Sequence, residues 1–344
     1  MGQRPTIMDV AKKAGVSKVT VSYVLNGQGA RARISTSTSE KVLSAAKELG
    51  YAPSAIARMM VKKSSSTLAL VFQHAQYFTV WSSFTSELMH GICQATVTQS
   101  YDLMLHTGSL SDGRSEADAL ADGRVDGVLV LRNRDDETLI ELLHRPLPVV
   151  LFCCRSEDPN VAFVDADNFD GGKMAANHLI ELGHREIGII LGDVNSTSSI
   201  ERHRGFRAAL EEHGIPYNPD FAAQGIHDKE QSKRLEHLLK SPNRPTAFFS
   251  WSDDDAINLL NLARDLNIKV PQDLSIVGFD SLSPAEFSRP ALTSISQPVR
   301  EISKKAAELL IEICSNAKPA EYQIVMPVKL DIRASTGPPG RKHP

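Results

Sequence analysis

Two patterns of apolar residues divide this chain of 344 residues. Before residue 50, apolar side chains recur every three or four positions, which predicts short amphipathic helices. From residue 67 onward, short continuous apolar runs alternate with helical stretches. The runs are TLALVF, YDLMLH, GVLVL, PVVLF, IGIIL, TAFFS and LSIVGF, and helices are expected at 82–99, 170–182, 201–213 and 254–266. Such alternation is typical of parallel sheets covered by helices on both faces.

The first fifty residues predict three short helices. Residues 6–9 have the form of a capping box, so a helix should begin near Ile7 and end at Gly15. Ser17 can cap a second helix, and a third is expected over about 36–49. The residues expected to point inward on the third helix are Val42, Leu43, Ala46 and Leu49.

This helix pattern and the charge of the same segment point to nucleic acid. Two short helices with a glycine-containing turn, braced by a third, form a helix-turn-helix, whose second helix fits the major groove. Residues 1–63 hold eleven Lys and Arg against three Asp and Glu, a net charge of +8 in a chain whose total is −3. A basic head on an acidic body indicates a module that binds a polyanion. The alternative is a generic three-helix bundle with a solvated basic face.

Composition and cysteine spacing exclude several classes of protein. The chain has no apolar run of 18 residues, so no membrane span is expected. Its first residues lack a basic segment followed by an apolar stretch, so no secretory signal is expected either. The four cysteines, Cys93, Cys153, Cys154 and Cys314, have no metal-ligand spacing. We therefore expect reduced thiols and a cytoplasmic, nucleoid-associated protein.

The motifs of common enzymes are absent from the sequence. No GxGxxG follows a strand, and neither a phosphate-binding loop nor a GxSxG elbow occurs. His178 and His184 lack a supporting set of metal ligands. The acidic run 253–255 follows an apolar run and opens a helix, which favours helix capping over metal binding. We expect neither an enzyme nor a bound cofactor or metal.

The segments TIMDVAKKAGVSKVTVSYVLNG and ISTSTSEKVLSAAKELGYAPSAIARMM resemble the DNA-binding head and hinge of the LacI/GalR family of transcriptional repressors. The resemblance extends from Thr6 to about Ser335. It implies an α/β fold, with a small all-α helix-turn-helix head and a two-lobed periplasmic-binding-protein-like core with parallel sheets. The implied parts are a head at 1–50, a hinge helix or linker at 51–66, an N-lobe at 67–182 plus 291–321, a C-lobe at 183–290 plus 322–336, and a disordered tail at 337–344.

The residues expected to contact DNA lie in the head and hinge. Met60 aligns with the family residue that wedges into the minor groove, which kinks the duplex; a flexible linker is the alternative for this segment. Many family members have Arg where Tyr23 stands, and the loop GQGARAR adds two arginines near the phosphates. The full set is Thr6, Ser17, Lys18, Val19, Thr20, Ser22, Tyr23, Asn26, Arg31, Arg33, Tyr51, Ser54, Ala57 and Met60.

A second set of residues is expected to bind a small-molecule effector. Asp170, Arg202 and Gln297 match family cleft positions, although Asp170 could be a helix cap and Arg202 a surface residue. Many relatives have Asn at Ser252. The full set is His74, Gln76, Phe78, Trp81, Asp170, Arg202, His227, Ser252, Asp253, Asp280 and Gln297. Charged and amide groups beside aromatic rings suit a polyhydroxylated ligand, so a sugar or sugar phosphate is expected first and a nucleoside second.

Together these features predict a ligand-regulated, sequence-specific transcription regulator. We expect a repressor of sugar-utilisation genes that binds a palindromic operator as a homodimer, because two heads must meet a two-fold site. No leucine heptads follow Ser335, so no tetramerisation helix is expected. The competing hypothesis is a sugar- or nucleoside-binding protein without DNA function. Such a protein would need an export signal and would have no use for a basic head.

Overall fold

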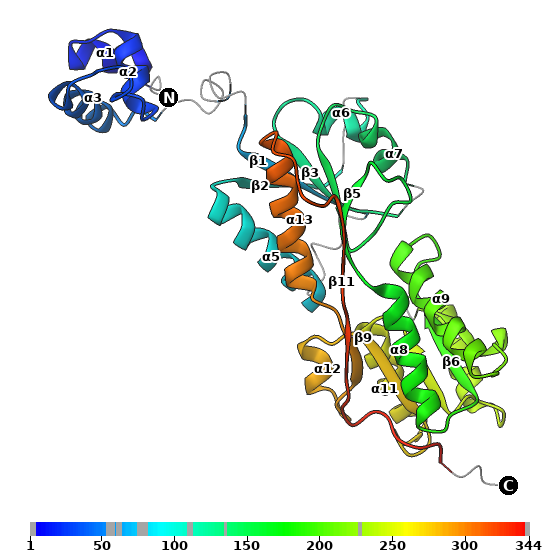
Figure 1. Cartoon of the computed structure of the whole chain (residues 1–344). Coiled ribbons are helices and arrows are strands. Elements are labelled where there is room, and N and C mark those ends of the chain that lie inside the picture. The colour runs from blue at the N-terminus through cyan, green and yellow to red at the C-terminus, as the bar shows by residue number, and fades with distance from the viewer. Residues whose placement is uncertain are drawn as a thin grey trace. The chain divides into compact units, whose positions relative to one another are not determined.

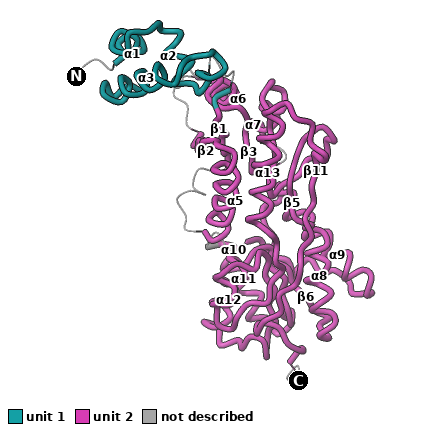
Figure 2. Tube along the Cα trace, turned by 60° about the vertical axis from the view of Figure 1, so that its left-hand side comes forward, with its two compact units in different colours: residues 1–65 teal, residues 66–344 magenta. Residues whose placement is uncertain are grey.

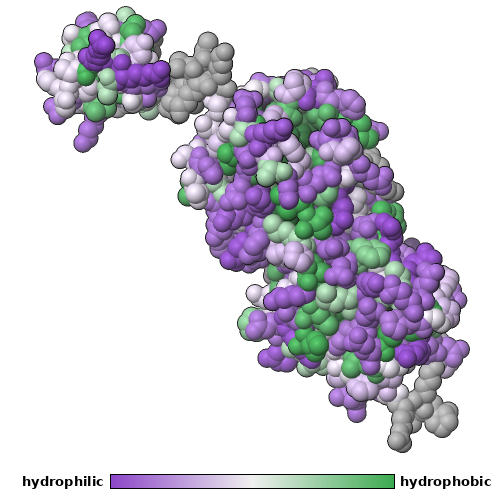
Figure 3. Space-filling model, in the orientation of Figure 1, coloured by the Kyte–Doolittle hydropathy of each residue, from purple (hydrophilic) through white to green (hydrophobic). Residues whose placement is uncertain are grey.

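The computed structural model contains two compact units, residues 1–65 and 66–344 (Figures 1 and 2). On the face of the molecule drawn in Figure 3, hydrophilic side chains cover most of the surface, because the apolar residues gather in five interior clusters. The structure describes residues 5–52, 59, 64–73, 82–108, 113–133, 136–225 and 229–340.

The first unit has the predicted helices, α1 (Ile7–Ala14), α2 (Lys18–Leu25) and α3 (Thr36–Leu49). The capping box is present: the amide of Asp9 donates to Thr6 Oγ1, and the amide of Thr6 donates to Asp9 Oδ2 at 2.8 Å. Leu43 is 53% exposed, so its predicted inward position is wrong. The buried stripe of α3 consists of Val42, Ala45 and Ala46. Leu43 follows Val42 in the sequence, but it lies outside this stripe of the helix surface.

The N-lobe of the second unit is built on a six-stranded sheet in the order β11-β5-β4-β3-β1-β2. Its paired strands all run parallel, as the continuous apolar runs predict. Helices α5 and α13 pack on one face, and α6 and α7 pack on the other (Figure 1). The elements are β1 (Thr67–Phe72), α5 (Ser83–Gln99), β2 (Asp102–His106), α6 (Glu116–Leu120), β3 (Gly127–Leu131), α7 (Glu137–Leu143), β4 (Val149–Phe152), β5 (Ala162–Ala166), α13 (Val299–Cys314) and β11 (Gln323–Met326).

The C-lobe is built on a second six-stranded sheet in the order β12-β10-β9-β8-β6-β7, in which only the β10–β12 pair is antiparallel. Helices α8 and α9 pack on one face, and α10, α11 and α12 contribute to the other. The elements are α8 (Asn168–Glu181), β6 (Ile187–Leu191), α9 (Thr197–Glu212), η2 (Pro219–Phe221), β7 (Ala222–Gln224), α10 (Lys229–Lys240), β8 (Ala247–Ser250), α11 (Asp253–Asp265), β9 (Ser275–Asp280), α12 (Ser283–Phe287), β10 (Thr293–Ser296) and β12 (Lys329–Asp331).

The chain crosses between the lobes at other places than the sequence predicts. The predicted crossovers are near Gly183, Ala291 and Glu321. In the structure they lie between β5 and α8, between β10 and α13, and between β11 and β12. Helix α8 belongs to the C-lobe because Ala175 and Leu179 pack in the C-lobe core. Apolar runs reveal strands, but they do not reveal which sheet a strand joins.

The described part of the C-terminal tail packs against the C-lobe, so the predicted disorder of 337–344 is wrong for residues 337–340. The amide of Gly337 donates to Ser275 Oγ at 3.0 Å, and the Gly337 carbonyl oxygen lies 2.9 Å from Nε2 of His184. Burial lowers the pKa of His184, which favours the neutral ring. A glycine- and proline-rich composition favours disorder only where no such anchoring contacts exist.

Two glycines let α8 and α9 cross closely. A Cβ atom at Gly205 would overlap the carbonyl oxygen of Phe169, and one at Gly172 would overlap the carbonyl oxygen of Arg202. We expect Gly205→Ala to lower the free energy of unfolding by about 1–3 kcal/mol, because two packed backbones must separate. Urea denaturation would measure this, with Glu211→Ala on the exposed side of α9 as the control. Equal stability of the two variants would contradict the close crossing.

Candidate functional site

The outer face of α2 carries several of the residues that the sequence predicts to contact DNA. Ser17 caps the helix, and its Oγ accepts the amide of Thr20 at 3.1 Å. Lys18 is exposed, Val19 is 61% exposed and Tyr23 is 42% exposed. Val21 and Val24 on the opposite face are buried in the head core, and Ser22 is half-buried. The helix therefore holds its inner face fixed and presents the predicted contact residues outward, as a recognition helix must.

The loop that follows α2 presents the two predicted arginines. Asn26 ends the helix, and its Nδ2 donates to the carbonyl oxygen of Ser22 at 2.8 Å. The amide of Ile34 donates to the carbonyl oxygen of Gly29 at 2.9 Å, which closes the loop. Arg31 and Arg33 are both exposed. Exposed guanidinium groups on a closed loop beside α2 can neutralise phosphates.

Two further predicted contact residues have structural roles in the head. Thr6 caps α1, and its Oγ1 donates to Asp9 Oδ2 at 2.7 Å. Tyr51 is half-buried and packs against the head core. Ser54, Ala57 and Met60 of the predicted hinge lie outside the described residues. The same is true of His74, Gln76, Phe78, Trp81 and His227 of the predicted effector site.

Arg202 is the centre of the predicted effector site. It lies on α9 and is buried, with its guanidinium carbon 3.5 Å from the ring centroid of Phe279. Its Nε donates to Oδ1 of Asn168 at 2.8 Å, and its Nη1 donates to the carbonyl oxygen of Trp251. Burial lowers the pKa of Arg202, and the carboxylate of Asp280 opposes that change. Arg202 is therefore not the surface residue that the sequence offers as the alternative to an effector-binding arginine.

Asp280 ends β9 beside this arginine. Gln297 donates from Nε2 to Asp280 Oδ1 at 2.6 Å, so two predicted site residues are in direct contact. Asp280 has a φ of 121° and the following Ser281 a φ of 54°, both in the region that side chains rarely adopt. Burial raises the pKa of Asp280 to about 6, although Arg202 and the Gln297 hydrogen bond oppose the rise.

Asp253 begins α11 and is buried close to Asp280. It accepts from Ser294 Oγ at 2.5 Å through Oδ1 and from the amide of Leu282 at 3.0 Å through Oδ2. Burial and the charge of Asp280 raise its pKa well above the usual value. Ser252 caps the same helix, because its Oγ accepts the amide of Asp255 at 3.3 Å. The predicted capping function of this acidic segment is therefore performed by Ser252.

Asp170 lies apart from these buried groups. It is exposed in the first turn of α8, and the cap of that helix is Asp167, whose Oδ1 accepts the amide of Asp170 at 3.0 Å. The interpretation of Asp170 as a helix cap is thus wrong. The side chain of this turn that reaches Arg202 is Asn168, which the sequence analysis missed.

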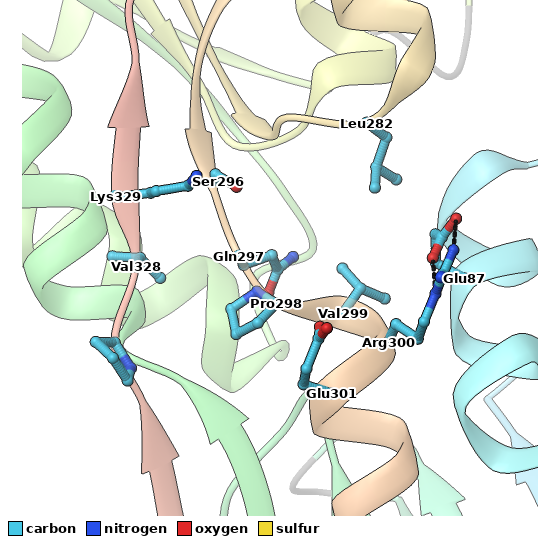
Figure 4. Close-up of a pocket in the computed structure, with 11 residues that line it drawn as sticks. Glu87, Leu282, Ser296, Gln297, Pro298, Val299, Arg300, Glu301, Val328 and Lys329 are labelled. Carbon is cyan, nitrogen blue, oxygen red and sulfur yellow. Dashed lines mark hydrogen bonds and ion pairs between the residues drawn. The ribbon is translucent and has the colours of Figure 1, made fainter. Parts of the chain in front are cut away.

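A cavity of about 460 Å³ lies along two of the crossovers (Figure 4). Gln297 and Pro298 line it from the β10–α13 crossover, and Val328 lines it from the β11–β12 crossover. Glu87 of α5 and Arg300 of α13 form a bidentate ion pair at its edge, in which Arg300 Nε and Nη2 donate to the Glu87 carboxylate at 2.7 and 3.0 Å. Since Gln297 also contacts Asp280, this cavity adjoins the predicted effector site.

The described residues contain no group of three or more His, Cys, Asp and Glu side chains that could hold a metal ion. Within the same part of the chain, no helix is long and apolar enough to cross a membrane.

Comparisons with known proteins agree with the two units. The family of bacterial regulatory proteins called the lacI family matches residues 6–54, and the periplasmic binding protein-like domain matches residues 176–336. The HTH-type transcriptional repressor PurR of Aliivibrio salmonicida is 34% identical over 313 residues, which are 89% of this chain and 91% of the relative. PurR of Haemophilus influenzae (strain ATCC 51907 / DSM 11121 / KW20 / Rd) is 33% identical over 315 residues, which are 89% of this chain and 90% of the relative.

Solved structures show the same architecture. A complex of the transcriptional regulator CelR with cellobiose matches 96% of this chain and 100% of its own, with 31% identity and a TM-score of 0.72. The Lac repressor dimer bound to operator and the anti-inducer ONPF matches 97% of this chain and 100% of its own, with 23% identity and a TM-score of 0.83. The second likeness concerns the fold alone.

A helix-turn-helix head joined to a two-lobed core with a buried polar site defines a DNA-binding transcriptional repressor with a small-molecule effector. The chain belongs to the lacI family of bacterial regulatory proteins, as the resemblance in its sequence predicts. Its relatives are transcriptional repressors rather than enzymes. The lacI-family head and these relatives argue against a generic helix bundle and against a solute-binding protein without DNA function.

Proposed function

We propose that this repressor responds to a carbohydrate that binds around Arg202 and Asp280, and that it controls sugar-utilisation genes. The observation that carries the proposal is a buried guanidinium and a buried carboxylate that each influence the pKa of the other, with Gln297 donating to the carboxylate at 2.6 Å. Guanidinium groups donate to hydroxyl oxygens and carboxylates accept from hydroxyl hydrogens, so the pair suits vicinal hydroxyl groups. The cellobiose bound by the similar regulator CelR supports this class of ligand.

A nucleoside or free base is the second candidate for the effector. Gln297 and Asp280 place an amide and a carboxylate on adjacent side chains. An amide and a carboxylate together offer the donors and acceptors that the edge of a base requires. This ligand would need an aromatic or apolar contact over its ring, whereas a sugar would need more hydroxyl contacts.

The two candidates can be separated by one series of experiments. Selection of bound fragments from sheared genomic DNA would identify the operator. Thermal shift of the full chain would then be measured with monosaccharides, disaccharides, sugar phosphates, nucleosides and free bases. Operator binding would be titrated with and without each compound that stabilises the protein. A change of operator affinity with a sugar alone supports the proposal, and a change with a nucleoside or base alone overturns it.

The operator complex is proposed to be a dimer on a palindromic site. A two-fold operator presents two half-sites, and each head fills one of them. The hinge residues Ser54, Ala57 and Met60 are proposed to contact the DNA between the half-sites, with Met60 wedged into the minor groove. Mass measurement of the complex in solution would test the stoichiometry, since one chain per palindrome would contradict it.

The exposed residues of the head predict two different effects on DNA binding. Replacing Lys18 with Ala should change the ranking of operator base substitutions, because a contact to a base edge carries about 1–3 kcal/mol of discrimination. Replacing Arg31 with Ala should weaken all operators alike, because a phosphate contact carries no sequence information. It should also make the slope of log affinity against log salt concentration shallower by about one, because one phosphate contact is lost. Competition binding over a set of operator variants measures both effects.

Lys47→Ala is the control for these head variants, since it removes the same charge from the last turn of α3. If the Lys18 variant, like the Arg31 variant, merely scales the affinity of every operator by one factor, the assignment of α2 as the recognition helix is wrong.

A further inference from the structure

A chain of hydrogen-bonded polar side chains leads from the half-buried Arg155 to the buried Arg202, and we call it the Arg155–Arg202 relay. Arg155 Nε donates to Asp165 Oδ2 at 2.8 Å, and Asn168 Nδ2 donates to the same oxygen at 2.9 Å. Asn168 Oδ1 in turn accepts from Arg202 Nε at 2.8 Å. Both Arg155 Nη2 and Asn168 Nδ2 also donate to the carbonyl oxygen of Ala166, at 2.6 and 3.1 Å. The relay thus consists of Arg155, Asp165, Asn168 and Arg202, with one backbone carbonyl at its centre.

Asn168 has one possible orientation in this relay. Its side chain is 0% exposed, so water does not replace either neighbour. The carboxylate of Asp165 accepts hydrogen bonds and the guanidinium of Arg202 only donates them. The amide nitrogen of Asn168 must therefore face Asp165, and its oxygen must face Arg202. These hydrogen bonds to the buried Asn168 fix the direction in which Arg202 Nε points.

The relay also connects the two lobes. Arg155 follows β4, and Asp165 lies within β5 of the N-lobe sheet. Asn168 is the first residue of α8, and Arg202 lies on α9, both in the C-lobe. The link between Asp165 and Asn168 therefore passes through the first crossover of the chain. A rotation of one lobe against the other at this crossover would act on the hydrogen bond between Asp165 and Asn168.

We propose that Asn168 is the positioning residue of the effector site and that the Arg155–Arg202 relay ties the direction of Arg202 to the arrangement of the lobes. This proposal rests on the proposed function, because it assumes that Arg202 binds the effector. Asn168 is buried behind Arg202 and acts on the effector through that arginine. The planar guanidinium is otherwise held by the face of Phe279 and the carbonyl oxygen of Trp251, which do not fix its Nε.

The first test needs no effector. In the full chain labelled with 15N-arginine, the Nε–H signal of Arg202 would be assigned from its loss in an Arg202→Lys variant. We expect Asn168→Ala to speed the exchange of this hydrogen with solvent by about tenfold or more, because a hydrogen bond to a charged donor is lost. Leu179→Ala is the control, since it leaves a cavity in the same helix away from Arg202. Equal exchange in the parent and in Asn168→Ala would overturn the proposal.

The second test exchanges the two members of the relay that face each other. Asn168→Asp places two carboxylates in contact. Their repulsion should displace the carboxylate at position 168 from Arg202 Nε, so the Arg202 Nε–H should exchange faster than in the parent. In the D165N/N168D double variant, the amide at position 165 can donate to the carboxylate at position 168, which still accepts from Arg202. Slow exchange should then return. If the double variant exchanges as fast as Asn168→Asp alone, the relay does not position Arg202.

The compound with the largest thermal shift in the effector panel completes the series. Its affinity should fall about tenfold in Asn168→Ala, return in the double variant and stay unchanged in Leu179→Ala, although Leu179→Ala lowers the unfolding temperature. A purely structural role of Asn168 predicts the opposite result, with both alanine variants losing stability and both keeping affinity. If no compound in the panel binds, the proposed function fails while the exchange measurements still decide the position of Arg202.

Discussion

Replacing Arg202 with Ala should abolish the response to effector. The guanidinium is buried, and its loss leaves the oxygen of Asn168 and the carbonyl of Trp251 without their donor. It also leaves the carboxylate of Asp280 without its main opposing charge. Each hydrogen bond that the guanidinium would donate to the effector is worth about 1.5–3 kcal/mol, so effector affinity should fall by about 10- to 100-fold. Isothermal titration with the stabilising compound from the panel measures this fall.

Two further variants separate charge from geometry at this position. Arg202→Lys keeps the positive charge but lacks the planar guanidinium that lies on Phe279 and donates to two acceptors. We therefore expect this variant to lose most of the effector affinity that Arg202→Ala loses. Arg204→Ala removes an exposed arginine two positions along α9 and should bind effector like the parent. Unchanged effector affinity in Arg202→Ala would show that the effector binds elsewhere.

The head was predictable from its sequence because its signals are local. The capping box at residues 6–9, the cap at Ser17 and the glycines at the ends of α1 and α3 each determine a helix boundary within a few residues. Leu43 is the exception, since an apolar residue beside the buried stripe of a helix cannot be told from a member of the stripe. Core formation, and not hydropathy alone, decides which of two adjacent positions is buried.

The core was predictable only in part. The apolar runs correctly predicted β1, β3, β4, β6, β8 and β9, because helices cover both faces of these strands and their side chains are therefore almost all apolar. Strands β11 and β12 were missed because they have only four and three residues and lie at the edges of their sheets, where none of their side chains is fully buried. Their sheet membership, and hence the crossovers, depends on contacts between segments far apart in the sequence.

The residues of the candidate effector site were also predictable only in part. Arg202 and Gln297 were predicted because they match positions of a known family, and Asp280 because it ends an apolar strand; the structure brings Asp280 and Gln297 into contact. Asn168 was missed because its partner Arg202 is 34 positions away. One signal could have found it: Asp165 interrupts an apolar strand just before Asn168, and a charged residue inside a buried strand requires a polar partner.

Acidification should stabilise the ligand-free protein through Asp280. Its pKa is raised to about 6 from a usual 3.8, chiefly by burial, so the folded state holds this proton more tightly than the unfolded state. The resulting stabilisation is fully present below pH 3.8 and is lost as the pH rises through about 6. Between pH 7.5 and 4, the difference in unfolding free energy between the parent and Asp280→Asn should change by about 2 kcal/mol in favour of the parent. Urea denaturation of both proteins over this range measures the change.

Comparing the two proteins isolates the aspartate from the other groups that titrate. Burial lowers the pKa of His178, His184 and His203, so acid destabilises the fold through these histidines, but it does so equally in both proteins. The Asp280 charge also raises the pKa of Asp253, whose contribution has the same sign. A difference that does not vary with pH would contradict a raised pKa at Asp280. A ligand whose hydroxyl donates to the ionised carboxylate must compete with this proton, so effector affinity should weaken as the pH falls below 6.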